Sequence, residues 1–420
     1  MIKAKTLCKS HSFILSIVFI IQVLQPCISS AFFELQDGDR YIDLRGSVRA
    51  YGTMYQNPDN DFYFRQSSDT QAAGTARLLM QSGLSRNLGF EFNIYQAVIP
   101  DSLISSQAAS NNSSDVERSS GVEWSLSDDR YTHLAFDRLN LQWTYDRISI
   151  TAGRQPVNLA TTFYFSPNDL FAPFAAQTFY RVYKPGVDAL RSEIRLGDFS
   201  QLSLIGVLGY DNNPQSITGW TKSPESSRNS YLGRISAVMH NFEWAAICGE
   251  LTDKRIIGGS LQGEIFKWLG IRAEGHRLYP GGLHKDSYTE FAVGLEHRWE
   301  NSLNIRLEQF YHGSGSGPVS DYAISSLNSQ TGSSYLGRNY TALGTSYEFT
   351  PLLTGDISAI INQTDHSFLM SLNFIYSLAD EAELSFNLSA PFGKEPDGPV
   401  IKSEFGMTPY SFNVEMRCYF

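Results

Sequence analysis

The chain has 420 residues, enough for two or three ordinary domains or for one large barrel. Aromatic residues make up 13% of the sequence, charged residues only 18%, and the formal net charge is -10. This acidic balance, without a basic cluster, argues against nucleic acid as a partner. Outside the first thirty-one residues only Cys248 and Cys418 remain. They lie on separate predicted strands, so neither a disulfide framework nor a zinc site is predicted.

Residues 1–31 have the pattern of a secretory signal peptide. Three lysines within the first nine residues give a positive start, and residues 13–24 form an apolar run too short to span a membrane as a helix. Small residues then precede a cleavage point near Ala31. Lipidation at Cys27 is the alternative, which the preceding Pro26 disfavours. We therefore expect an exported protein.

Beyond the leader, apolar and polar residues alternate with a period of two along most of the chain. One apolar stripe consists of Phe368, Met370, Leu372, Phe374 and Tyr376. Segments of about ten residues with one apolar and one polar face are typical of a transmembrane β-barrel with a wet interior. We expect residues 32–420 to form an all-β antiparallel transmembrane barrel of about 18 strands, or alternatively about 16. The expected strands begin near residues 41, 73, 88, 133, 147, 186, 200, 230, 242, 255, 269, 287, 302, 335, 354, 367, 381 and 408.

The predicted connections alternate between short and long. Short periplasmic turns and long external loops are typical of outer-membrane barrels, whereas a soluble sandwich has turns of similar length at both ends. The tight turns are at 85–87, 145–147, 240–241, 266–268, 300–302 and 379–381. The long connections are at 56–72, 100–132, 154–185, 211–229, 279–286, 313–334 and 391–407, with 252–254 and 363–366 as short exceptions on the long side.

The third long connection, residues 154–185, contains eight aromatic residues. Loops of this length with their own packing are usually functional. Ser166 as N-cap, Pro167 at the first helical position and Asp169 in the first turn predict the start of a short helix. We expect this loop to fold into the barrel as a constriction; an ordinary packed surface loop is the alternative. The expected constriction residues are Arg154, Gln155, Asn168, Asp169 and Arg181.

The polar faces of the predicted strands differ in charge between the two halves of the chain. If these faces line the lumen, one wall is basic and the other acidic, and the field across the channel orients dipolar solutes. The alternative is that the charges pair across neighbouring strands and only keep the wall polar. The expected basic wall comprises Arg45, Arg49, Arg77, Arg138, Arg191, Arg195 and Arg234. The expected acidic wall comprises Glu264, Glu274, Glu290, Glu296, Glu308, Glu348, Glu383 and Glu415.

The last ten residues alternate in character and end in an aromatic residue. The apolar positions Phe412, Val414, Met416 and Phe420 resemble the assembly signal of Gram-negative outer-membrane barrels. In architecture the whole mature chain resembles porin-like proteins. Gly153, Arg154 and Gln155 also resemble a motif of alginate-export-type barrels, from which no substrate is transferred. The resemblance implies a location in the outer membrane of a Gram-negative bacterium, with outer-membrane lipid and the barrel-assembly machinery as partners.

We expect a channel for passive diffusion of small polar solutes, without cofactor or metal. One alternative is a structural or adhesive barrel that only displays loops. Another is a barrel-borne hydrolase, but no serine lies in a G-x-S-x-G elbow, and no catalytic residue is predicted. The solute and the oligomeric state stay open, a homotrimer included. Aromatic residues near the short turns suggest an interfacial girdle: Trp143, Tyr145, Trp268, Trp299 and Tyr347.

Overall fold

A computed structural model describes residues 33–64, 66–98, 116–126, 132–174, 176, 183–213, 216, 219–281, 287–323 and 335–420. The leader predicted over residues 1–31 and the expected constriction residue Arg181 lie outside the described residues.

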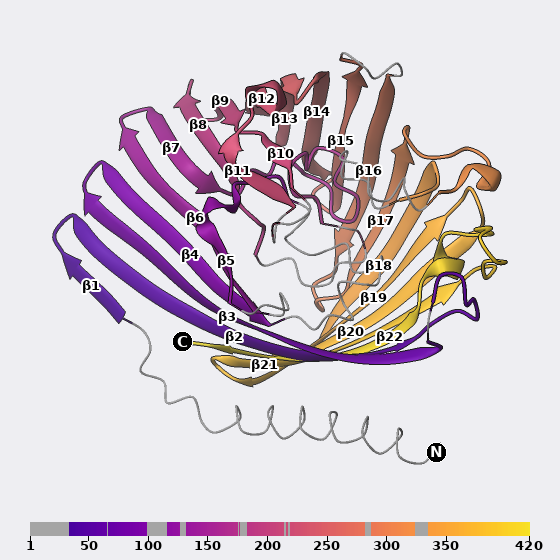
Figure 1. Cartoon of the computed structure of the whole chain (residues 1–420). Helices are drawn as coiled ribbons and strands as arrows, with labels where there is room; N and C mark the ends of the chain where they lie inside the picture. Colours follow the sequence, from indigo (N-terminus) through magenta and orange to yellow (C-terminus); the bar gives the residue numbers. More distant parts are fainter. Residues whose placement is uncertain are drawn as a thin grey trace.

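Eighteen antiparallel strands form a closed ring, as predicted, and neighbours along the chain pair in turn. The first and last of them, β2 and β22, lie side by side and close the ring (Figure 1). Closure leaves both edges of the strands paired, so their backbone groups are satisfied within the barrel. The ring consists of β2 (Arg40–Gln56), β3 (Ser68–Ser85), β4 (Leu88–Val98), β6 (Thr132–Tyr145), β7 (Ile148–Gln155), β8 (Val187–Arg195), β9 (Ser200–Val207), β12 (Ser230–Met239), β13 (Phe242–Leu251), β14 (Lys254–Ile265), β15 (Leu269–Tyr279), β16 (Tyr288–Arg298), β17 (Asn304–His312), β18 (Asn339–Thr350), β19 (Leu353–Asn362), β20 (Ser367–Ala379), β21 (Ala382–Phe392) and β22 (Tyr410–Tyr419).

The two faces of each strand differ as the alternation predicts. On β17, Ile305 and Leu307 are 38% and 44% exposed, whereas Glu308 and Phe310 are 2% and 3% exposed. Large exposed apolar side chains recur at alternate positions around the ring. We call the opposite face, on which Glu308 lies, the polar face. Successive side chains of a strand point to opposite faces, so one stripe of the sequence is sufficient to assign both.

The short turns hold the strands at one end of the ring. The turns after β12 and β14 each place two consecutive residues at positive φ, His240 and Asn241 at 54° and 64° and Phe266 and Lys267 at 57° and 62°. Such turns match the right-handed twist of paired strands. All six predicted tight turns are confirmed by the strand ends, and Leu352 lies in a further tight turn between β18 and β19.

Small elements outside the ring were not expected from the alternation. They are β1 (Phe33–Asp37), β5 (Glu123–Ser125), β10 (Tyr210–Asn212), β11 (Trp220–Pro224) and the single 3-10 turns η3 (Ser120–Val122), η4 (Ser226–Arg228), η5 (Val319–Asp321) and η7 (Phe405–Met407). Two ring strands begin away from their expected positions, β3 at Ser68 and β18 at Asn339. The start of β3 is polar and gives no apolar stripe. Leu336, before β18, is instead buried in a cluster between loops.

The seam of the barrel brings the two ends of the described chain together. Phe420 and Gly46 exchange backbone hydrogen bonds of 2.6 and 2.9 Å between β22 and β2. N-terminal to Gly46, β1 pairs with the first five residues of β2, on the edge that β22 leaves open. The ring of Phe420 occupies the space that a side chain at Gly46 would need. A glycine at residue 46 therefore makes room for the terminal aromatic residue.

Aromatic side chains gather near the short turns, as predicted. Trp143, Tyr145, Trp268 and Trp299 are exposed at 40%, 62%, 53% and 42%. His297 lies between Trp268 and Trp299, with ring centroids 5.2 and 4.1 Å away. Tyr347, the fifth predicted member, is only partly exposed and packs edge-on against Phe349. Across the described residues, no helix is long and apolar enough to span a membrane.

Candidate functional site

The β7–β8 connection, residues 156–186, begins at a distorted end of β7. Gly153 has a φ of 117°, and a Cβ there would collide with the carbonyl oxygen of Leu139, so this position requires glycine. Arg154 follows and is only 2% exposed. Its guanidinium donates to both carboxylate oxygens of Asp188, at 2.9 and 3.0 Å, and to Glu123 at 3.1 Å. A planar fork of donors matches a carboxylate in this way, which lysine cannot reproduce.

Arg154 belongs to a buried chain of ion pairs in which bases and acids alternate. Successive nitrogen–oxygen distances are 2.8, 2.9, 2.7, 3.1 and 2.9 Å. Burial raises the pKa of the Glu123 carboxyl, while Arg118 and Arg154 act against this shift. Three positive and three negative groups balance, so the network needs no further counter-charge. Its members in order are Arg77, Asp137, Arg118, Glu123, Arg154 and Asp188.

Gln155, the last residue of β7, is also 2% exposed. Its side-chain amide donates to the carbonyl oxygens of Thr151 and Ala189, both at 3.0 Å. Gln155 and Arg154 were expected to line a constriction. In the structure both side chains are buried and tie the root of the connection to the barrel.

Two carboxylates on distant strands bind the backbone of the same connection. Glu308 of β17 accepts from the amides of Phe163, Tyr164 and Phe165 at 2.8, 3.0 and 2.7 Å. Glu274 of β15 accepts from Thr162 at 3.0 Å, and also from the amides of Thr161 and Asn168. Glu274 and Glu308 were expected to line an acidic wall. Their carboxylates are directed at the connection instead.

Asn168 is a further point of attachment and has no exposed surface. Its amide nitrogen donates to the carbonyl of Gly259 on β14 at 3.0 Å, and its amide oxygen lies 3.3 Å from Nδ1 of His276 on β15. Its backbone amide is held by Glu274 at 3.0 Å. One asparagine thus bonds Gly259 on β14 and both His276 and Glu274 on β15.

The predicted helix start at Ser166 is wrong. Residues 166–169 form a single turn in which the Asp169 amide donates to the Ser166 carbonyl at 2.9 Å. The turn does not continue into a helix, since Asp169 and Leu170 are in neither helix nor strand. Asp169 caps no helix; its carboxylate forms a buried ion pair with Lys184, which also donates to the carbonyl of Ala172 at 2.8 Å. Burial lowers the pKa of the Lys184 amine, and Asp169 opposes that shift.

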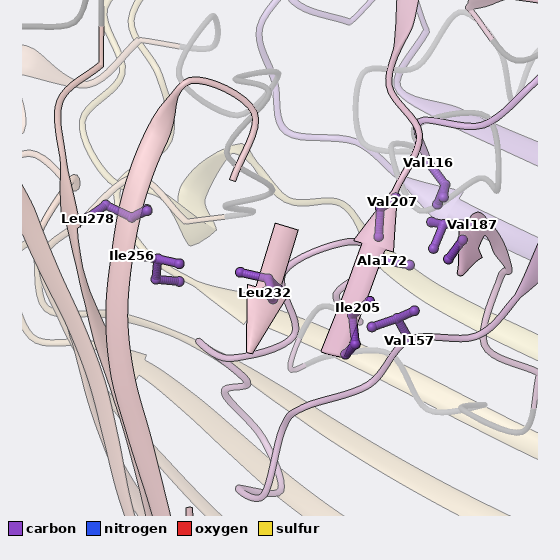
Figure 2. Packing of buried hydrophobic residues seen from close by; sticks show 10 residues of the cluster. Val116, Val157, Ala172, Val187, Ile205, Val207, Leu232, Ile256 and Leu278 are labelled. Atoms are coloured by element: carbon purple, nitrogen blue, oxygen red, sulfur yellow. The ribbon is translucent and has the colours of Figure 1, made fainter. Parts of the chain in front are cut away.

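Apolar residues of the connection pack against the polar faces of many strands. In Figure 2, Val157 lies next to Ile205 of β9. Phe165 stacks on Phe310 of β17, with ring centroids 4.9 Å apart. The first cluster contains Val116, Val157, Ala172, Val187, Ala189, Ile205, Val207, Leu232, Ile256 and Leu278. The second contains Tyr164, Phe165, Ala176, Ala292, Phe310, Tyr340, Ala342, Ile360, Leu369 and Phe405.

Two arginines contact the connection beside the carboxylates. Arg272 donates to the carbonyl of Thr161 at 3.1 Å, and the guanidinium of Arg306 lies 4.0 Å from the ring centroid of Phe163. Glu296 lies 3.4 and 3.5 Å from the two arginines. The half of the ring that the sequence predicts to be acidic therefore also presents positive charge to the connection.

A cavity of about 80 Å³ lies where the connection leaves the barrel wall. Its residues come from 157–159 and from the polar faces of β8, β9 and β12. Arg191, Glu193 and Arg234 bring charges of both signs to its lining. Arg191 and Glu193 are 3.8 Å apart, and Arg234 is paired with Glu243 at 2.9 Å.

The remaining charges of the two expected walls are mostly paired with neighbours. Arg45, Arg49 and Arg138 lie 2.7, 2.5 and 2.8 Å from Asp43, Glu415 and Glu91, and Arg195 donates to the backbone carbonyl of Asp146. On the other side, Glu290, Glu348 and Glu383 lie 2.7, 2.8 and 3.0 Å from His312, Arg298 and Arg417, while Glu264 is exposed. Both halves of the ring therefore contain basic side chains and carboxylates close to each other.

A serine, a histidine and a carboxylate meet after β17, an arrangement that the sequence analysis missed. Nδ1 of His312 lies 2.7 Å from Glu290, and Oγ of Ser314 lies 3.3 Å from Nε2 of His312. Ser314 also donates directly to Glu290 at 3.1 Å. The nearby amides of Gly315 and Ser316 donate to carbonyls of the chain and are not available for an oxyanion. These contacts are therefore those of a hydrogen-bond network that holds the start of a loop, not those of a nucleophilic serine with a general base.

Within the described part of the chain, no group of three or more histidine, cysteine, aspartate or glutamate side chains is arranged to hold a metal ion.

The four residues of the expected terminal assembly signal differ in exposure. Phe412 and Phe420 are 40% and 39% exposed, Val414 is half-buried, and Met416 is buried.

No protein-family model and no curated protein matches this chain. Solved structures do match it over nearly its whole length. OccAB4 of Acinetobacter baumannii is 9% identical with a TM-score of 0.56, over 92% of this chain and 99% of that one. OccK9 (OpdG) of Pseudomonas aeruginosa is 12% identical with a TM-score of 0.59, over 90% and 98%.

A third similar structure is OccK2 (OpdF) of Pseudomonas aeruginosa, solved in complex with glucuronate. It is 10% identical with a TM-score of 0.58, over 90% of this chain and 98% of that one. The chain therefore resembles these Occ porins in its fold, at low sequence identity.

Proposed function

We propose that this protein is an outer-membrane channel through which small polar solutes diffuse. The observation that carries the proposal is the closed ring of eighteen strands with exposed apolar side chains on one face and charged side chains on the other. A barrel of about this strand count is wide enough for an aqueous channel, and its apolar outer face suits lipid. The resemblance in fold to the Occ structures supports the same function.

The β7–β8 connection is proposed as the constriction of this channel. Glu308 alternates with the exposed Leu307 on β17, so its carboxylate belongs to the face that we assign to the lumen. The connection starts at β7 and its amides reach Glu274 on β15 and Glu308 on β17, on the far side of several intervening strands. A path through the lumen accounts for these contacts. A barrel that merely anchors external loops has no need of them.

The proposed solutes are small molecules that combine a carboxylate with other polar groups. OccK2 is known in complex with glucuronate, a sugar acid. In this chain the cavity beside residues 157–159 presents Arg191 and Arg234, which suit a carboxylate, and Glu193, which suits hydroxyl or ammonium donors.

Residues 1–31 remain a predicted signal peptide, consistent with export to an outer membrane. The terminal strand remains the proposed site of contact with the barrel-assembly machinery, and outer-membrane lipid the proposed surroundings of the exposed apolar face.

The test is to reconstitute the purified, folded protein in planar bilayers and in liposomes. We expect stable unitary conductance steps, and liposome swelling with glucuronate that exceeds swelling with a neutral disaccharide. Heat-modifiable migration on gels serves as the control for folding. A folded barrel that gives neither conductance nor swelling would show that the protein is not a diffusion channel.

A further inference from the structure

Six backbone amides of the connection converge on only two side chains, Glu274 and Glu308. Glu308 receives three consecutive amides, those of residues 163–165, and Glu274 receives those of residues 161, 162 and 168. Consecutive amides that point at one anion form a strong anion-binding concavity. Here the anion is a side chain of the barrel itself.

The two carboxylates and the connection satisfy each other. Glu274 and Glu308 are 4% and 2% exposed, and a buried carboxylate is stable only when donors surround it. Residues 161–168 belong to neither strand nor helix, so their amides need partners from elsewhere. Removing the carboxylates leaves the buried amides without acceptors, and moving the amides away leaves the buried carboxylates without donors.

The positions of the two carboxylates determine the course of the chain between them. Residues 161–162 start at Glu274 on β15, residues 163–165 reach Glu308 on β17, and Asn168 returns to Glu274. The segment is thus a hook held at two points on one side of the ring. Its tip is the group of three amides at Glu308.

Glycines on the neighbouring strands make room for this hook. Gly294 pairs with Glu308 across β16 and β17, and a Cβ at Gly294 would lie 3.1 Å from Cγ of Glu308. On β18, a Cβ at Gly344 would overlap the hydroxyl of Tyr164. Side chains larger than hydrogen at these positions would displace the carboxylate or the tip of the hook.

We propose that Glu274 and Glu308 are positioning residues that clamp the hook and thereby set the aperture of the channel. This inference rests on the proposed function for its effect on transport, but the clamp itself is a property of the fold. Other glutamates of the polar faces, such as Glu383 with Arg417, serve as ion-pair partners within the wall. Glu274 and Glu308 therefore have a different role from the other glutamates of the expected acidic wall.

The principal variants are Glu274→Gln, Glu308→Gln and the double substitution. Glutamine keeps the shape of glutamate, but its amide nitrogen opposes the backbone donors, so only one oxygen can still accept. Glu383→Gln is the matched control because it removes the same charge from a polar face without touching the connection. We expect the hook variants to replace the single parental conductance level with several higher levels, and the control to keep one level.

Hydrogen–deuterium exchange tests the clamp independently of transport. In the folded parent, the amides of residues 161–165 and 168 should be protected. Protection at residues 163–165 should be lost in Glu308→Gln and retained in Glu383→Gln. Equal protection and equal conductance in all three proteins would overturn the clamp. A parent with protected amides but without conductance would overturn the channel function alone.

Gly344→Leu provides a test that changes no charge. The leucine side chain would push Tyr164 away from β18, so it should disturb the hook as Glu308→Gln does. If it raises conductance and removes protection at residues 163–165, the effect of the glutamate variants is one of position. If only the charge variants act, Glu274 and Glu308 affect ions directly and do not clamp the hook. Should the double variant fail to fold, the single variants and Gly344→Leu carry the same comparison.

Discussion

Tyr164 lies so close to Gly344 that an ideal Cβ on the glycine would overlap the tyrosine hydroxyl and lie 2.8 Å from Cζ. Tyr164 belongs to the β7–β8 connection and Gly344 to β18. A residue from the first half of the chain therefore contacts a strand from its last quarter. This contact, together with the carboxylate clamps, means that the connection and the far wall of the barrel depend on each other. Substitutions in the connection and substitutions in the far wall should therefore both alter the aperture of the proposed channel.

Phe420 is expected to be necessary for insertion into the membrane. Its ring covers Gly46, and its backbone completes the seam between β22 and β2. Phe420→Ser should be exported but not assembled, and Gly46→Leu should weaken assembly by excluding the ring. The measurement is heat-modifiable migration of protein recovered from the outer membrane. Normal migration of Phe420→Ser would show that the terminal residue is dispensable.

Deleting residues 160–180 should raise unitary conductance and admit larger solutes, because the proposed constriction is removed. Single-channel recording and liposome swelling with sugars of increasing size measure the two effects. The folded state of the deletion should be verified first, since both apolar clusters lose members. Unchanged conductance would mean that this segment lies outside the lumen.

Asp169→Ala should disturb the connection strongly, because it leaves the buried Lys184 amine without its carboxylate. Breaking a buried pair by removing one partner costs about 3–5 kcal/mol. The expected readout is increased exchange and proteolytic sensitivity around residues 166–174. Asp169→Ala combined with Lys184→Met should recover much of the protection, since the unpaired charge is then absent. A double variant no better than the single one would show that the ion pair does not hold the connection.

The contact of Glu404 with β18 predicts a pH dependence for the loops that contain residues 335–338 and 403–407. Glu404 accepts from Tyr340 and from Asn362, the latter at 2.7 Å. Burial raises the pKa of Glu404 from 4.5 to about 7; the Tyr340 hydrogen bond acts against this shift and the nearby Asp365 adds to it. The packed loops therefore bind the proton more tightly than open loops do. Their added stability is fully present below pH 4.5 and is lost as the pH rises through about 7.

Exchange measured at residues 335–338 and 403–407 provides the check. After correction for the intrinsic rate, protection should fall by up to roughly tenfold per pH unit between the two pKa values. Glu404→Gln imitates the protonated acid and should show a flat profile. The same slope in parent and variant would assign the pH dependence to another group.

The field across the channel is tested with arginines that remain partly exposed. The side chains of Arg45 and Arg49 are 59% and 33% exposed. Changing both to Gln should shift the reversal potential in a salt gradient toward cations and slow the passage of zwitterions. Changing both to Lys keeps the charge and should leave the potential at the parental value. If the Gln variant also keeps the parental potential, these arginines only hold the wall together.

The sequence by itself determined the strands, their faces and the alternation of turns. These features are local, because a period of two places apolar side chains on one side of any strand, and lipid selects that side. Phe368 to Tyr376 on β20 shows this: its stripe can be identified without knowing which strands lie next to it. The same reasoning supplied the number of strands, since each strand is separated from the next by a turn with its own signal.

Only the tertiary structure decided what the polar residues do. Glu308 and Glu383 look alike in sequence, yet one binds amides 143–145 residues away and the other an arginine on the next strand. Asp169 has the sequence environment of a helix start but pairs with Lys184, and Arg154 at a strand end is buried among acids. The physical reason is that a buried charge is stabilised by whichever donors and counter-charges surround it. Closing the ring brings those partners together from distant parts of the chain.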